Sequence, residues 1–188
     1  MQSEAVADLL KEGFPAGAVE PVTAGDGMAT IYVVRDHLVD VCRELRDRPE
    51  LGFLLAVDMT AVDYMPREPR FEVVTHLVSI GPGFGGTPKR LRVKVRVPGN
   101  DATLPTISGV WPSMNWAERE VYDMFGIQFD GHPNLQRILM PEDWEGYPGR
   151  KDYPVQIKMP PKVYEPLELT PQQFAENVRA SQQRVRPK

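Results

Sequence analysis

The sequence predicts a mixed α+β domain with a mainly antiparallel sheet and helices packed on one side, followed by a long extended C-terminal arm. Three observations lead to this prediction. Residues 91–97 alternate between apolar and basic side chains, which is the period of a half-buried strand. Residues 38–45 and 117–125 carry apolar side chains at helical spacing. Beyond Gly126, prolines recur too often for regular elements to continue.

The N-terminal part of the chain contains a predicted helix, a loop, a strand and a second helix, in that order. Residues 6–11 are typical of the end of a short helix, and residues 15–27 have the composition of a loop. Residues 29–34 alternate as a first strand. Asp36 is placed to cap the helix that follows, and that helix carries an apolar stripe of Leu38, Val41, Cys42 and Leu45.

Three further stretches have the composition of strands. Residues 53–62 are almost continuously apolar and suit a central strand, while residues 71–80 and 91–97 suit its neighbours. The last of these predicts a basic outer face of Arg90, Arg92, Lys94 and Arg96. Such a face is usually solvated, although it also suits an acidic protein neighbour or RNA. RNA is disfavoured because the strand lacks stacking aromatic side chains. We expect His37 and His76 to be packing residues.

A helix is predicted to end at Gly126. Asn115 and Glu118 have the spacing of a capping box, and Gly126 falls where a left-handed stop is needed. Ala117, Val121, Met124 and Phe125 form its apolar stripe, which leaves four charges on the other faces: Glu118, Arg119, Glu120 and Asp123.

The three carboxylates among these charges, with His132, could be catalytic groups or metal ligands. However, Glu118 and Glu120 are two residues apart and point about 200° from one another on a helix, so they cannot share one substrate or ion. We therefore favour buried or interfacial pairs and keep an acid–base enzyme using Glu118, Glu120, Asp123 and His132 as an alternative hypothesis. Basic partners further along would reach the helix only if the chain folds back; these are Arg137, Arg150 and Lys151. His132 is expected to pin the turn after the helix.

The composition changes after Gly126, where aromatic and aliphatic residues persist between closely spaced prolines. Apolar side chains on an extended tail need a surface to cover them. We therefore divide the chain into a globular domain at residues 1–130 and an extended assembly arm and tail at residues 131–188. Two interpretations remain open: the tail lies on its own domain, or residues 132–161 lie over another subunit.

Composition and charge exclude several classes of protein. A net charge of -4 and 41% hydrophobic residues indicate a globular domain that does not bind nucleic acid. Apolar runs fall far short of the roughly 20 residues needed to span a bilayer. Cys42 is the single cysteine, so this chain cannot by itself hold an iron–sulfur cluster, which takes about four protein ligands. The N-terminus lacks the pattern of a signal peptide, and we expect a cytoplasmic protein.

The glycine-rich residues 81–86 match the spacing GxGxxG of a dinucleotide-binding loop. That loop needs a helix to begin at the glycines, so that its N-terminal amides meet the pyrophosphate. Pro88 and a strand follow instead, and we expect a hairpin connection.

The region after Trp116 carries a series of closely spaced motifs, which are Glu118-Arg119-Glu120, Asp123-Met124-Phe125-Gly126, Gly131-His132-Pro133, Arg137-Ile138-Leu139, Pro141-Glu142-Asp143-Trp144 and Arg150-Lys151-Asp152-Tyr153-Pro154. In this order they resemble the 30-kDa (C) subunit of respiratory NADH:quinone oxidoreductase, complex I. Weaker similarity, including Asp58-Met59-Thr60 and Val62-Asp63-Tyr64, extends the resemblance to about residues 28–155. One departure is Gln136, where the family usually has a basic residue.

The resemblance implies a non-catalytic structural subunit of the peripheral arm that contacts the 49-kDa (D) subunit near the quinone-reducing region. It implies no cofactor in this chain, with FMN, iron–sulfur clusters and quinone held by partner subunits. The complex would sit on the bacterial inner membrane, with this chain a peripheral component on the cytoplasmic side that is soluble when isolated. Related membrane-bound hydrogenases and ferredoxin-linked complexes share much of the signature. The residues implied as interface or structural are Glu118, Arg119, Glu120, Asp123, Phe125, Gly126, His132, Pro133, Arg137, Pro141, Trp144, Arg150, Lys151, Asp152, Tyr153 and Pro154.

Overall fold

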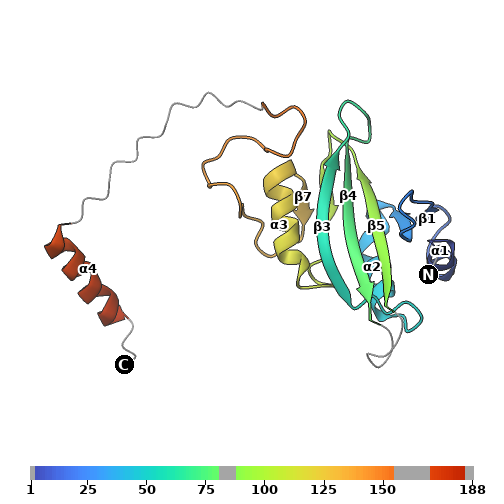
Figure 1. The fold of residues 1–188 in the computed structure, drawn as a ribbon, viewed down its shortest axis with the longest axis horizontal. Coiled ribbons are helices and arrows are strands. Elements are labelled where there is room, and N and C mark those ends of the chain that lie inside the picture. The colour runs from blue at the N-terminus through green and yellow to red at the C-terminus, as the bar shows by residue number, and fades with distance from the viewer. Residues whose placement is uncertain (1–2, 81–87, 155–169, 185–188) are drawn as a thin grey trace. The chain divides into compact units, whose positions relative to one another are not determined.

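A computed structural model describes residues 3–80, 88–154 and 170–184, the last five without their side chains. The chain divides into two units, Met1–Pro154 and Val155–Lys188. The first unit is built on a five-stranded sheet in the order β1-β2-β5-β4-β3 (Figure 1). Its strands are β1 (Val19–Val22), β2 (Thr30–Val33), β3 (Leu55–Asp63), β4 (Phe71–Ser79) and β5 (Lys89–Val97).

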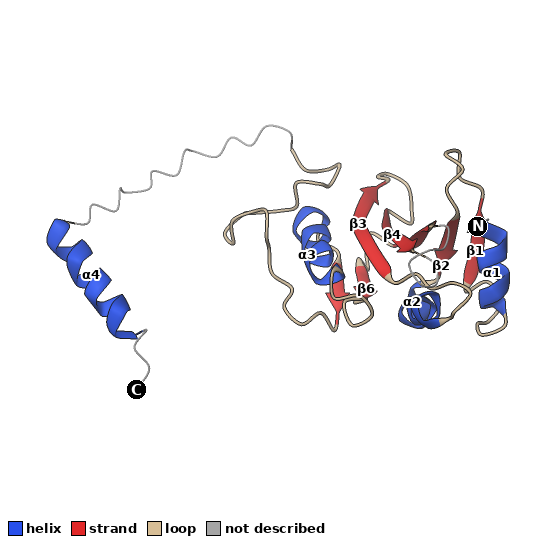
Figure 2. Cartoon of the chain, turned by 60° about the horizontal axis from the view of Figure 1, so that its bottom comes forward, coloured by secondary structure: helices blue, strands red, loops and turns tan. Residues whose placement is uncertain are grey.

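Within this five-stranded sheet, the pairing of β2 with β5 is parallel and the other three pairings are antiparallel. The prediction of a mixed, mainly antiparallel sheet is therefore confirmed. A smaller sheet pairs β6 (Thr103–Pro105) with β7 (Gln128–Asp130) in parallel. Helix α3 (Met114–Phe125) connects β6 to β7 and lies beside β3 (Figure 2).

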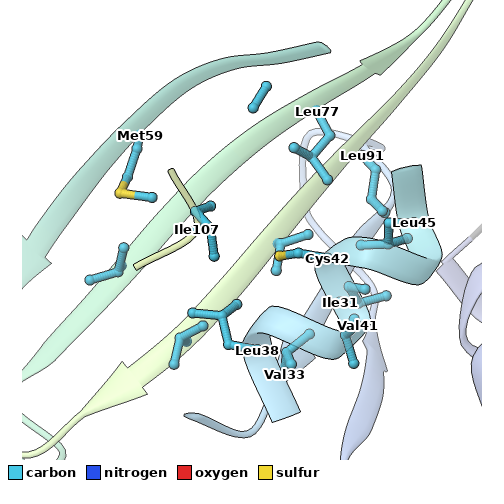
Figure 3. Close-up of a cluster of buried hydrophobic side chains, with 14 of the residues drawn as sticks. Ile31, Val33, Leu38, Val41, Cys42, Leu45, Met59, Leu77, Leu91 and Ile107 are labelled. Atoms are coloured by element: carbon cyan, nitrogen blue, oxygen red, sulfur yellow. The ribbon is translucent and has the colours of Figure 1, made fainter. Parts of the chain in front are cut away.

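The core lies between the five-stranded sheet and helix α2 (Leu38–Asp47). The predicted stripe of Leu38, Val41, Cys42 and Leu45 is buried and faces Ile31 and Leu91 of the sheet (Figure 3). Burial raises the pKa of the Cys42 thiol well above its ordinary value, so this cysteine is an inert packing residue. Helix α1 (Ser3–Lys11) packs against β1 and buries Val6, Ala7 and Leu10.

The structure corrects two predictions about strands. Residues 53–62 were expected to contain a central strand, but β3 is the edge of the sheet, and Leu55 and Val57 are exposed. A long apolar run therefore did not indicate burial on both faces. The predicted loop at residues 15–27 contains β1, whose Val19 is buried under α1. The strand was not predicted because it is short and contains Pro21. Both features are typical of edge strands.

Two predicted helix caps are wrong. Asp36 lies in a short 3₁₀ helix (Arg35–His37), and α2 begins without a side-chain cap. Glu118 does not close a capping box with Asn115, because it points into the interior and α3 begins at Met114. The helix end is confirmed: Gly126 has a φ of 71° and donates its N–H to Tyr122 O.

The prediction that prolines exclude regular elements beyond Gly126 is wrong for β7 and for helix α4 (Pro171–Arg184) of the second unit. Helix α4 begins with a capping box. There Thr170 N–H donates to Gln173 Oε1 at 3.0 Å, and Gln173 N–H donates to Thr170 Oγ1 at 3.3 Å. The spacing of Thr170 and Gln173, with Pro171 at the first helical position, is the sequence signal for this start.

The two packing histidines differ in their surroundings. His37 packs edge-on against Phe14, with ring centroids 6.2 Å apart, so that prediction is confirmed. His76 is not surrounded by apolar side chains. It is half-buried, accepts a hydrogen bond from Arg92 Nε at 3.2 Å and lies 3.8 Å from Asp58.

The glycine-rich residues 81–86 lie outside the described part of the chain. The strands on either side of them pair antiparallel, with Ser79 opposite Lys89. The basic face of β5 is partly neutralised by acidic side chains, because Arg92 pairs with Asp26 and Lys94 with Glu72.

Candidate functional site

Residues 131–154, which we call the returning segment, run back along α3 and the end of β3. The first compact unit ends at Pro154, beyond the domain boundary predicted at residue 130. Among the contacts that hold the returning segment are four groups that each involve residues of the sequence signature.

Asp123 of α3 provides the first contact. Its Oδ2 accepts the N–H groups of Ile138, Leu139 and Met140 at 3.0, 2.7 and 2.8 Å, and its Oδ1 accepts Arg137 Nη1 at 2.7 Å. The side chain is completely buried. Burial alone would raise the pKa of Asp123, but the three amides and Arg137 outweigh it and hold the pKa below its ordinary value. A buried charge is thus matched by donors that lie 14 to 17 residues later.

Asp63, at the end of β3, provides the second contact. Arg70 binds it through Nε and Nη2 at 3.0 and 2.8 Å, and Lys151 N–H donates to Asp63 Oδ2 at 2.8 Å. Arg70 Nη2 also contacts Asp152 Oδ1 at 2.7 Å. Burial opposes the charge on Asp63, but these donors lower its pKa to about 2. The end of the returning segment is therefore tied to the hairpin between β3 and β4.

Two arginines of the returning segment provide the third contact. Arg150 Nε donates to Phe125 O at 2.5 Å and so caps the C-terminal end of α3. Its guanidinium stacks on Tyr147 at 4.6 Å, while Arg137 Nη2 donates to Gly146 O at 2.9 Å. A Cβ added at Gly126 would lie 2.5 Å from the Tyr147 ring. Gly126 is therefore required both for its positive φ and for this close approach.

Glu118 and His132 form the fourth contact, deep beneath α3. Both side chains are completely buried, with Glu118 Oε2 3.9 Å from His132 Nε2. Glu118 also accepts Ile107 N–H at 2.7 Å and the Thr106 hydroxyl at 2.5 Å. Burial dominates over these hydrogen bonds and raises the pKa of Glu118 to about 7.

The hydrogen bonds of His132 assign its tautomer. Asn134 N–H donates to His132 Nδ1 at 3.0 Å, so Nδ1 carries no proton. Nε2 then carries the proton and donates to Asn115 O at 3.1 Å. Through these two hydrogen bonds His132 joins the turn after β7 to the start of α3.

The remaining predicted site residues divide into half-buried and exposed ones. Arg119 donates to Gln136 O and Arg137 O at 3.0 and 3.4 Å, so at the unusual Gln136 the chain is held through its backbone. Phe125 and Trp144 are half-buried, and Tyr153 donates to Glu145 O at 3.3 Å. The exposed residues are Glu120, Pro133, Pro141 and Pro154.

The four groups of the acid–base hypothesis are not brought together. Glu118 and His132 are buried side by side, Asp123 is saturated by its own donors, and Glu120 is exposed. Two further structural residues, Asp63 and Arg70, lie within the weaker family similarity and were not predicted to hold the returning segment. No local spacing indicates them, because the Asp63 partner Lys151 lies 88 residues away.

Within the described residues, no three His, Cys, Asp or Glu side chains gather in a group that could hold a metal ion. In the same part of the chain, no helix has the length and apolar character needed to cross a bilayer.

The chain matches known proteins over most of the first unit. Residues 31–158 match the family described as respiratory-chain NADH dehydrogenase, 30 Kd subunit. The chain is 50% identical to the NADH-quinone oxidoreductase C subunit of Roseiflexus sp. over 69% of its length and 71% of that protein. It is 49% identical to the C subunit of Geobacter sulfurreducens over 78% of this chain and 86% of the relative. It spans only 57% of the length of the C subunit of Saccharopolyspora erythraea, at 46% identity.

Two solved structures share the fold. A trypsin-resistant fragment (1-134) of Nqo5 is 37% identical, with a TM-score of 0.55, and covers 72% of this chain and 100% of the fragment. A chain of the archaeal membrane-bound sulfane sulfur reductase is 28% identical, with a TM-score of 0.65, covering 81% of this chain and 85% of that one. The shared family match, sequence identity and fold lead to one conclusion: this chain belongs to the family of the 30-kDa subunit of respiratory-chain NADH dehydrogenase, the C subunit of the bacterial NADH-quinone oxidoreductases.

Proposed function

We propose that this chain is a non-catalytic structural and assembly subunit in the peripheral arm of a proton-translocating NADH:quinone oxidoreductase. Its chief partner is the 49-kDa (D) subunit, near the quinone-reducing region. The proposal rests on what residues of the family signature do in the structure: Asp123, Arg137 and Arg150 hold the returning segment.

The state of the carboxylates supports a structural role. A catalytic acid or base must reach substrate, but Asp123 and Asp63 are already saturated by several donors, and Glu118 is closed off from solvent. In this proposal FMN, iron–sulfur clusters and quinone belong to partner subunits, and the chain itself binds none of them. It lies on the cytoplasmic side of the inner membrane and reaches the membrane only through the complex.

The residues after Pro154 form the assembly arm in this proposal, together with the exposed surface of the returning segment. The solved Nqo5 fragment is described as trypsin-resistant, and all of it aligns with this chain. We infer by analogy that trypsin cleaves the isolated chain beyond its compact unit and that assembly protects the same sites.

The test is co-purification. An affinity-tagged full-length chain is expressed with the other subunits in a host that lacks its own 30-kDa subunit, and the recovered proteins are identified by mass spectrometry. We expect recovery of the 49-kDa subunit and restoration of NADH:quinone activity in the membranes. A chain recovered alone, with no activity restored, contradicts the proposal.

One observation favours a second candidate, the equivalent subunit of a related membrane complex. The sulfane sulfur reductase chain shares this fold at 28% identity and aligns over 85% of its length. The same purification separates the two candidates, because a preparation that oxidises ferredoxin, or reacts with hydrogen, in place of NADH identifies the related complex.

A further inference from the structure

The beginnings of β3 and α3 lie side by side (Figure 2), and both elements carry large apolar side chains that are exposed. Leu55 and Val57 of β3 are 49% and 61% exposed, and Trp116 of α3 is 64% exposed. The Ser113 hydroxyl donates to Ala56 O at 3.0 Å, which fixes the start of α3 against this strand. Trp116 follows Ser113 by three residues and so lies on the next turn of the helix. We call Leu55, Val57 and Trp116 the seam patch.

The core does not use these side chains. The register of β3 shifts between Ala56 and Asp58, so Val57 stands at a bulge while Ala56 and Met59 are buried. The Trp116 ring is covered on one side by the Arg119 guanidinium at 4.8 Å. Single exposed apolar residues are ordinary, but an aromatic and two aliphatic side chains exposed at the start of two neighbouring elements indicate a contact surface.

The edge of β3 is not free to accept an added strand at this point. Trp111 Nε1 donates to Phe53 O at 3.1 Å, and Ser113 takes Ala56 O in the same way. A partner would therefore dock on the side chains of the seam patch and not by extending the sheet.

Acidic side chains border the seam patch. Asp58 adjoins Val57 and its side chain is 61% exposed, while the exposed Glu120 lies one turn beyond Trp116. Arg119 is already engaged with Trp116 and with Gln136 O. An apolar centre with an acidic rim is complementary to a surface that has an apolar centre and a basic rim.

We propose that the seam patch is a docking surface for another protein subunit, which inserts an apolar side chain flanked by Lys or Arg. This inference rests on the proposed function, because the partner is a subunit of the same complex. Exposed Trp residues at the centre of such surfaces commonly carry much of the binding energy. The alternative is that a second copy of this chain binds the seam patch.

The experiment uses the full-length tagged chain with the other subunits, as in the co-purification above. The two test variants are Val57→Asp and Trp116→Ala, and the control is Val34→Asp. Val34 is 47% exposed and follows β2, which is not adjacent to β3 in the sheet order. The control therefore introduces the same charge away from the seam patch. We expect the first two variants to lower recovery of the complex about thirtyfold, as loss of a central contact does. Val34→Asp should leave recovery unchanged.

The acidic rim is tested with charge reversals. Asp58→Lys and Glu120→Lys should each reduce recovery, and rising salt should reduce recovery of the wild type, because paired rim charges are screened. Glu44→Lys, on the exposed face of α2, is the matched control and should have no effect.

Each outcome of these experiments supports or contradicts the proposed function or the seam-patch proposal. Failure of the wild type to recover the complex overturns the proposed function and the seam patch with it. If the wild type recovers the complex and the Val57→Asp and Trp116→Ala variants recover it equally well, only the seam-patch proposal is wrong. The same holds if Val34→Asp lowers recovery of the complex as much as the two test variants do. If the isolated wild-type chain is a dimer and Val57→Asp makes it monomeric, the seam patch serves self-association and the proposal is wrong. The melting temperature of each isolated variant is measured first, and if Val57→Asp is destabilised, Trp116→Ala decides.

Discussion

Single carboxylates set the path of the returning segment, because each one collects donors that are distant in the sequence. Asp123 gathers three consecutive backbone N–H groups and Arg137, and Asp63 joins Arg70 to Lys151 N–H. Glu120, on the same helix as Asp123, makes no comparable contact and is exposed. Asp123 and Glu120 should therefore respond differently to substitution.

Asp123→Ala is expected to lower the free energy of unfolding by about 3 to 5 kcal/mol, because it leaves Arg137 and three amides of the returning segment without their acceptor. Urea denaturation of the isolated chain measures the effect. Glu120→Ala is the control and should change stability by less than about 0.5 kcal/mol. Equal effects of the two substitutions would show that Asp123 does not anchor the segment.

Glu118 is expected to make stability depend on pH. Its pKa is about 7 in the folded chain against an ordinary value of 4.5, so the folded state binds its proton more tightly. The resulting stabilisation is complete below about pH 4.5 and is lost as pH rises towards 7, with a span on the order of 3 kcal/mol. Glu118→Gln, which keeps an acceptor for Ile107 N–H, should flatten this slope in melting curves recorded from about pH 4.5 to 8. An unchanged slope would assign the pH dependence to another group.

At the scale of elements, the end of α3 is where the helix, β7 and the returning segment meet. Gly126 turns the chain with a left-handed φ, Arg150 caps the Phe125 carbonyl, and Gly149 N–H donates to Met124 O at 2.8 Å. The helix stop is therefore also a docking point for the returning segment. Substitutions here should affect more than the helix.

Gly126→Ala is expected to destabilise the chain by at least about 1 to 2 kcal/mol, because alanine is strained at a φ of 71° and its Cβ would lie 2.5 Å from the Tyr147 ring. Gly109→Ala is the matched control, since a Cβ there meets no atom within 4 Å and the φ is not in the left-handed region. Thermal melting compares the two. A Gly126→Ala variant as stable as the control would show that Tyr147 does not pack against Gly126.

At the scale of the whole molecule, the compact unit includes the returning segment and ends at Pro154. The first interpretation of the proline-rich half, a tail lying on its own domain, therefore holds for residues 131–154. Residues 131–154 are packed on their own domain, and the proposal assigns the assembly contact to the surface of that unit and to the residues after it.

Truncation separates these two parts. A chain ending at Pro154 is expected to keep the melting behaviour of the full-length protein but to lose incorporation into the complex. A chain ending at Asp130 should melt at a lower temperature, because Asp123 and Asp63 lose the donors supplied by Arg137 and Lys151. Circular dichroism and co-purification report the two properties separately. Full incorporation of the chain ending at Pro154 would contradict an assembly role for the later residues.

The elements with strong local patterns could be predicted from the sequence alone. The alternation in β5, the stripe of α2 and the glycine stop of α3 each follow from interactions within a few residues. The edge position of β3 and the inward direction of Glu118 could not be predicted in this way. Both depend on which elements pack nearby, and a residue's own neighbours do not specify that.

The sequence by itself determined the family, the mainly antiparallel sheet and the charged residues of the signature, because motif order and side-chain period are properties of the chain. Only the tertiary structure decided what the charges do. Asp123 and Arg137 are 14 residues apart, and Lys151 lies 88 residues from Asp63. A carboxylate becomes an anchor only where folding removes it from water and brings donors to it, since burial without those donors would cost several kcal/mol.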